Sequence, residues 1–146
     1  MGSAASIGRE LRADLSRTIG DVMALACESL RAATPKDTEN AANNWIISVG
    51  APFSGTDGSQ TSPSHAAQDE GLDRIKSYDI GRDGKVYLRN NVVYLPNLDQ
   101  GASPQAEAGF VARAFYSAVA AAPHGRKGAA RQMLKGMART AFKAGR

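Results

Sequence analysis

The chain has 146 residues, 42% of them apolar, which is enough for one domain with a modest core. A single cysteine excludes an intrachain disulfide, and no run of 18 or more apolar residues predicts a membrane span. The net charge of +4 is unevenly distributed, because residues 1–120 carry 11 Lys and Arg against 14 Asp and Glu, whereas residues 121–146 carry seven Lys and Arg and no acid. A basic tail of this kind favours nucleic acid or an acidic protein surface.

A long amphipathic helix is predicted over residues 6–33. Its apolar residues recur in steps of three and four, as in Ile7, Leu11, Leu15, Val22 and Leu25. Gly20 permits a bend in the middle. Pro35 ends the helix, because it moves Thr34 out of helical geometry.

A short helical turn is predicted over residues 38–44, with the carboxylate of Asp37 as its N-cap. Residues 45–49, which are rich in β-branched side chains, then predict a strand that is followed by a glycine and a proline. Residues 52–62 are rich in Gly, Ser and Thr, and we expect them to form a mobile loop.

A helix over residues 63–77 is predicted next, because Ser62 resembles an N-cap and a proline follows it at the first helical position. The alternative is a strand over residues 75–80 that turns through residues 81–84 into the next element. Residues 85–90 form the clearest strand, since apolar and polar side chains alternate along them.

The next segment is predicted to lead into a C-terminal helix. Residues 92–101 form a loop or a short helix. Ser103 is expected to cap a helix that begins at Pro104 and runs to about residue 122, with its apolar residues on one side.

Residues 123–146 are interpreted as a basic helical arm outside the main domain of residues 1–122. The arm's apolar side includes Met133, Met137 and Phe142. Its cations are Arg126, Lys127, Arg131, Lys135, Arg139 and Lys143. Three interpretations stay open: the apolar side docks on a neighbouring subunit, the cations contact DNA or an acidic partner, or the arm has no fixed structure. Docking is favoured, because a solvated arm needs no Met and Phe side chains.

No residue pattern predicts catalysis, a cofactor or a metal. The two histidines, His65 and His124, lack partners at metal-ligand spacing and are expected to be solvated. Cys27 lies on the long helix without a neighbour that would lower its pKa, which favours a packed thiol. The Gly-x-Ser-x-Gly and phosphate-loop patterns are absent. The sequence therefore predicts a protein that is not an enzyme.

Two stretches of the chain carry a family resemblance. The first contains Thr34, Pro35, Asp37 and Thr38, followed by Asn44 and Trp45. The second contains Asn90, Asn91, Tyr94, Asp99 and Gly101, followed by Gln105, Ala106, Glu107, Ala108 and Gly109. Together they resemble the tail-completion or neck proteins (minor tail component family) of long-tailed bacteriophages. Two positions differ from that family: Glu39 replaces its usual glycine and Glu107 its usual proline.

The resemblance implies an α+β fold, in which a small, mainly antiparallel sheet is packed by the long N-terminal helix and a C-terminal helix. It implies a structural virion protein that is made in the host cytoplasm and forms a ring of six, or alternatively twelve, copies at the head–tail junction. Its partners would be its own copies, neighbouring neck, tail-terminator or tail-tube proteins, and packaged DNA, with no membrane. The alternative is a small, non-specific DNA-binding protein that acts through the basic arm.

Overall fold

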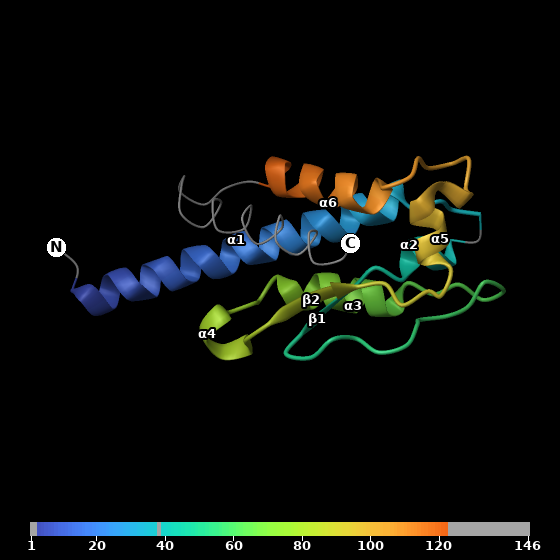
Figure 1. Cartoon of the computed structure of the whole chain (residues 1–146). Coiled ribbons are helices and arrows are strands. Elements are labelled where there is room, and N and C mark those ends of the chain that lie inside the picture. Colours follow the sequence, from blue (N-terminus) through green and yellow to red (C-terminus); the bar gives the residue numbers. More distant parts are fainter. Residues whose placement is uncertain (1–2, 38, 123–146) are drawn as a thin grey trace.

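The long N-terminal helix is the largest element of the fold. The computed structural model describes residues 3–37 and 39–122, and α1 runs through Ala4–Ala33 (Figure 1). Ser3 caps it, and Thr34 ends it in an extended conformation, as the following proline predicts. Gly20 does not interrupt the helix. A Cβ at this position would lie 3.1 Å from a backbone carbonyl of the element packed beside it, so the glycine permits close approach.

The sheet consists of two antiparallel strands. β1 (Ile46–Val49) pairs with β2 (Val86–Arg89), with Ile47 opposite Leu88. Both strands were predicted, each with one or two residues more. The helix α3 (Ala66–Ile75) packs against β1 so closely that a Cβ on Gly71 would lie 2.3 Å from the carbonyl oxygen of Ile47.

The elements form two layers with a cap at each end. In Figure 1, α6 (Phe110–Ala121) lies along α1, and the sheet and α3 lie on the other side of α1. The short elements α2 (Asn40–Asn43), α5 (Leu95–Asn97) and η1 (Leu98–Ala102) gather at one end of the domain. The turn α4 (Ile80–Asp83) lies toward the other end. The predicted α+β class is confirmed.

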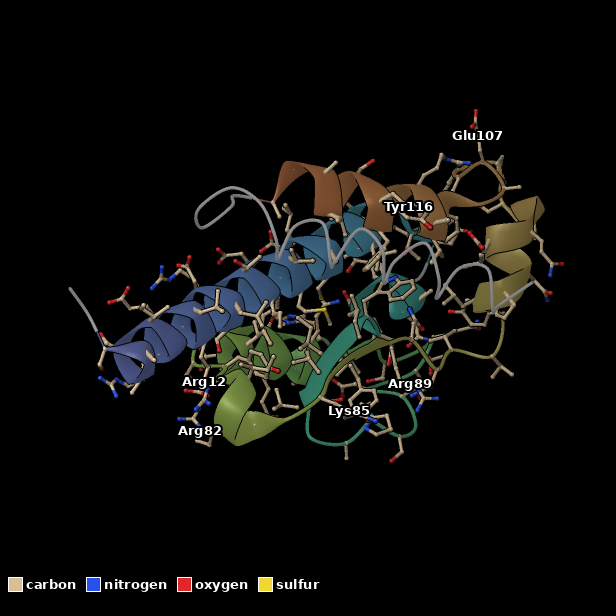
Figure 2. All side chains as sticks on the ribbon, turned by 60° about the vertical axis from the view of Figure 1, so that its left-hand side comes forward. Arg12, Arg82, Lys85, Arg89, Glu107 and Tyr116 are labelled. Carbon is tan, nitrogen blue, oxygen red and sulfur yellow. The ribbon has the colours of Figure 1, made fainter. Side chains whose placement is uncertain are left out.

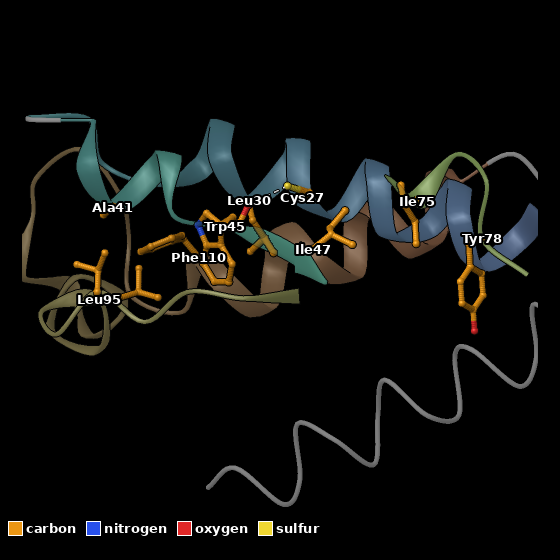
Figure 3. Close-up of a cluster of buried hydrophobic side chains, with 10 residues drawn as sticks. Cys27, Leu30, Ala41, Trp45, Ile47, Ile75, Tyr78, Leu95 and Phe110 are labelled. Atoms are coloured by element: carbon orange, nitrogen blue, oxygen red, sulfur yellow. Dashed lines mark hydrogen bonds between the residues drawn. The ribbon is translucent and has the colours of Figure 1, made fainter. Parts of the chain in front are cut away.

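The core lies between these layers and surrounds Trp45. Figure 3 shows the indole among the buried side chains Cys27, Leu30, Ala41, Ile47, Ile75, Tyr78, Leu95 and Phe110. A second, smaller cluster of Val22, Val119 and Ala122 joins the middle of α1 to the end of α6. Burial of these apolar surfaces, at about 25 cal/mol per Å², is the main force that holds α6 on α1.

The region between the strands differs from the sequence prediction. α3 begins at Ala66, so neither Ser62 nor the proline after it occupies a helix start. The alternative strand over residues 75–80 is also wrong, because Asp79 accepts hydrogen bonds from the amides of Gly81 and Arg82 and starts the helical turn α4. A carboxylate at an N-cap favours helix over strand at this point.

The predictions for the basic arm lie outside the described residues. They comprise the apolar residues Met133, Met137 and Phe142, and the cations Arg126, Lys127, Arg131, Lys135, Arg139 and Lys143. Within residues 3–37 and 39–122, no helix combines the length and the apolar character needed to cross a lipid bilayer.

Candidate functional site

The two stretches that carry the family resemblance meet in space at the α2–α5 end of the domain. We call the region formed by residues 34–45 and 90–111 the motif junction. Gln105 joins its two halves directly: its Oε1 accepts the backbone N–H of Lys36 at 2.9 Å, and its Nε2 donates to the carboxylate of Asp37. Residues nearly 70 positions apart in sequence are therefore in direct contact.

A buried hydrogen bond fixes the first half of the junction to the core. The indole Nε1 of Trp45 donates to Oγ1 of Thr34 at 2.8 Å, and the same hydroxyl donates to the carbonyl of Leu30 at 2.6 Å. Pro35, next to Thr34, is also buried. The threonine thus satisfies the polar atom of the largest core side chain, which would otherwise be buried without a partner.

Asn90 and Asn91, at the end of β2, tie the second half to its neighbours. Nδ2 of Asn90 donates to the carbonyl of Ala41 at 2.7 Å, and Nδ2 of Asn91 donates to the carbonyls of Phe53 and Gly55 at 3.0 and 2.9 Å. A third amide follows the same pattern across the junction, since Nδ2 of Asn40 donates to the hydroxyl of Tyr94 at 3.2 Å. These amides connect β2 with α2 and with the loop that follows β1.

The start of α6 corrects a prediction. The helix begins at Phe110, so Ser103 and Pro104 lie in the turns before it, where the Ser103 hydroxyl accepts the N–H of Gln105 at 3.2 Å. The cap comes from Asp99: its Oδ1 accepts the N–H of Val111 at 3.0 Å, and its backbone carbonyl accepts the N–H of Gly109 at 2.7 Å.

Glycine is required at both ends of this turn. Gly101 has φ +94° and Gly109 has φ +78°, which lie in the left-handed region that residues with a Cβ rarely adopt. The motif glycines therefore let the chain reverse between η1 and α6. Glu107 stands where the family usually has proline. It is exposed, and its carboxylate Oε2 lies 3.8 Å from Nη2 of Arg113. Figure 2 shows the Glu107 side chain pointing away from the domain.

Asp37 is not the N-cap that the sequence predicts. α2 begins at Asn40, so Glu39 and not Asp37 occupies the N-cap position, and the Asp37 carboxylate accepts a hydrogen bond from Gln105 instead. The residue before α2 is Glu39, with φ +59° and no side-chain cap. Glu39 therefore keeps the left-handed turn that glycine would adopt without strain.

The loop of residues 52–62 has no helix or strand, but it is anchored to the junction. Oδ1 of Asn44 accepts the N–H of Asp57 at 2.7 Å, and Nδ2 of Asn44 donates to the Asp57 carbonyl at 3.0 Å. The Asp57 carboxylate accepts the N–H of Ala67 at 2.8 Å and the hydroxyl of Ser64 at 2.9 Å, and these hydrogen bonds hold its pKa below the usual range. The loop thus supplies the cap for α3.

Two residues outside the motif junction, Gln68 and Asp57, have partners that sequence reasoning missed. Gln68 is fully buried on α3, where apolar neighbours were expected to face inward, and its Nε2 donates to the carbonyls of Ala42 and Trp45 at 3.1 and 3.0 Å. Asp57 looked like an ordinary loop residue. The sequence holds only weak signals for these two residues. For Asp57, the signal is a carboxylate about ten residues before a helix; for Gln68, it is a glutamine on the side of that helix that faces the core.

Two side chains with reactive groups, Cys27 and His65, have partners within the described residues. Burial raises the pKa of the Cys27 thiol to about 12, and the thiol donates to the carbonyl of Trp45. His65 is exposed, as expected, but it has the partner that the sequence analysis missed, with its Nδ1 2.6 Å from the Asp69 carboxylate. No group of three or more His, Cys, Asp and Glu side chains suited to a metal ion occurs within residues 3–37 and 39–122.

A cleft of about 320 Å³ lies between α1 and the segment that follows α3. Its lining includes Ser16, whose hydroxyl already donates to the Arg12 carbonyl and accepts the N–H of Ile80. Tyr78 also lines it, and its hydroxyl donates to the carbonyl of Gly84 at 2.5 Å. The hydrogen-bonding groups of these two side chains are used within the chain, so they do not define a ligand.

Comparisons with protein-family models, with curated proteins and with solved structures found no match for this chain. The resemblance to the tail-completion family therefore rests on the residues of the motif junction alone. What those residues do chemically is clear from their contacts: they hold four chain segments together through neutral and charge-assisted hydrogen bonds.

Proposed function

We propose that this protein is a structural subunit of the head–tail junction of a tailed bacteriophage, which forms a ring and joins the tail to the DNA-filled head. The observation that carries the proposal is the convergence of the two family stretches in one hydrogen-bonded motif junction. Residues such as Thr34, Asn90 and Asp99 direct their polar atoms at the chain itself. Such intrachain hydrogen bonds are expected of residues whose role is to fix the shape of a structural subunit.

The surface next to the junction offers a contact for a neighbour. Val93 lies between the buried Val92 and the half-buried Tyr94, yet its side chain is 92% exposed. An exposed apolar side chain in this turn is available for a contact with a neighbouring subunit. A closed ring needs a heterologous contact, in which this end of one copy meets a different surface of the next. Further partners would be neck, tail-terminator or tail-tube proteins.

The first experiment is deletion of the gene from the phage genome, followed by negative-stain microscopy of the lysate. Separate DNA-filled heads and finished tails are expected. Intact, infectious particles would refute the proposal.

A point variant tests the contact without disturbing the fold. Val93→Asp places a charge on a side chain that is almost fully exposed, so the domain should fold normally while infectious titre falls at least a hundredfold. Gln100→Asp is the matched control, since it adds the same charge at another exposed position of the same end. Equal titres for both variants would show that Val93 takes no part in assembly, whatever the gene deletion shows.

The alternative function, DNA binding through the basic arm, rests on residues outside the described part. The described residues carry 11 Lys and Arg against 14 Asp and Glu, and this net negative charge disfavours phosphate binding by the domain itself. Lys85, just before β2, and Arg89, at its end, are exposed cations at the sheet, as Figure 2 shows, but two such residues make a small patch. Salt-sensitive DNA binding that disappears when residues 126–146 are removed would favour this alternative.

A further inference from the structure

The N-terminal half of α1 leaves an apolar row without a partner among the described residues. Ile7 and Leu11 are 60% and 66% exposed, although they continue the same helical row as Val22 and Leu25. Farther along α1, this row packs against Phe115 and its neighbours on α6. Figure 1 shows that α1 extends well beyond the end of α6. The row therefore loses its cover where α6 ends.

The described chain stops at the place where this uncovered row begins. Phe110, at the start of α6, packs with Leu30, whereas Ala122 is buried against Val22, so α6 runs antiparallel to α1. A chain that continues in this direction passes Leu11 and then Ile7. Residues 123–146 therefore follow from one end of the uncovered row.

The length of the remaining segment suits the row. From Ala4 to Thr18, α1 is roughly 21 Å long, and residues 126–143 would span about 27 Å as a helix. In the described contact, Val119 meets Val22. If this register continues and three residues at Pro123 form the connection, Met133 falls near Leu11.

One flank of the row carries acidic side chains that suit a basic occupant. Glu10, Asp14 and Asp21 lie on one flank of the row, by their helical spacing. Glu10 and Asp21 form no ion pair within the described residues, whereas Asp14 lies 3.4 Å from Arg17. The segment 126–143 carries six Lys and Arg and no acid, so a docked position brings its cations near these carboxylates.

We propose that the Met133 and Met137 side of residues 126–143 packs as an antiparallel helix on the Ile7 and Leu11 side of α1 in the same chain. The same chain is favoured over a second copy, because residue 126 follows Ala122 by only four positions in the sequence, which keeps the segment at a high effective concentration. The inference does not depend on the proposed virion function.

Disulfide trapping tests this arrangement in the full-length protein. Leu11→Cys combined with Met133→Cys should give an intramolecular cross-link under mild oxidation, at a rate independent of protein concentration. Arg9→Cys with Met133→Cys is the control, because Arg9 lies at the same level on the opposite side of α1. The native Cys27 is buried and should not compete.

We expect the Leu11 pair to cross-link at least tenfold faster than the Arg9 pair. Equal rates would overturn the proposal. Cross-links that form only between chains, and increase with concentration, would also overturn it, because the occupant would then be a second copy.

Limited proteolysis provides an independent measurement. Leu11→Asp changes an exposed side chain, so the domain should stay folded while tryptic cleavage within residues 126–143 becomes at least tenfold faster. Arg9→Asp should leave that rate unchanged. No acceleration by Leu11→Asp relative to this control would contradict docking.

Discussion

The hydrogen bond between Thr34 and Trp45 allows a quantitative test of the motif junction. Thr34→Val replaces the hydroxyl with a methyl group of nearly the same size, so packing changes little. The Trp45 N–H, now buried without an acceptor, should cost about 1–3 kcal/mol. The Leu30 carbonyl keeps the backbone N–H of Thr34 as a donor at 3.0 Å and adds little to this cost. For a chain of this size, the melting temperature should fall by roughly 2–12 °C.

A double-mutant cycle identifies the partner. Urea unfolding followed by far-UV circular dichroism gives the free energy of unfolding without relying on the only tryptophan. Thr34→Val should cost much less in a Trp45→Phe background, because no indole N–H is then left unpaired. Thr34→Ser keeps the hydroxyl and should lose only about 1 kcal/mol through the missing methyl group. Equal costs of Thr34→Val in both backgrounds would refute the reasoning.

Three further variants, with Gly8→Ala as a control, test the backbone and the charges. Gly71→Ala should destabilise the protein by about 1–3 kcal/mol, because the new Cβ would meet the Ile47 carbonyl. Gly8→Ala has open space around the new Cβ and should stabilise α1 by up to about 1 kcal/mol in the same unfolding assay. Glu39→Gly should raise the free energy of unfolding by up to about 1 kcal/mol, because it relieves the left-handed strain at φ +59°. Asp57→Asn should destabilise the protein at pH 7. Because the pKa of Asp57 is lowered on folding, its contribution is present above the ordinary aspartate pKa of about 3.9, and the difference from wild type should shrink as pH falls below that value.

For each of the three variants, one result would contradict the physical argument behind the prediction. A neutral Gly71→Ala would mean that α3 can move away from β1 at little cost. A loss of stability in Glu39→Gly would show that the entropy of the unfolded chain outweighs the strain. A stability difference for Asp57→Asn that stays constant down to pH 2 would show that the carboxylate charge is not what stabilises α3.

The long helix and both strands could be predicted from the sequence, because their signal is local periodicity. The helix starts could not. Asp37, Ser62 and Ser103 are each good capping residues in the expected place, yet the helices that follow begin three to seven residues later. The structure supplies the caps of α3 and α6 from elsewhere, through Asp57 and Asp99, and short-range rules do not anticipate a cap that lies ten or more residues away.

The residues of the motif junction could be named from the resemblance, but their partners could not be predicted. Asn90 and Gln105 were named as residues of the family motif, at the end of a strand and near the start of a helix, without partners. Their contacts, with Ala41 and with the chain at Lys36, join positions 49 and 69 residues apart. Such pairings depend on the whole fold, so no window of sequence contains them.

These long-range contacts also have a consequence for how the chain folds. α1 can form from neighbouring residues within about a microsecond. Closing the motif junction costs a large loop-closure entropy before any of its hydrogen bonds is made. During synthesis, Lys36 has no partner in the junction until Gln105 has left the ribosome. The topology therefore predicts an order of events: α1 can form from local contacts, whereas the motif junction can close only after the chain through Gln105 is available.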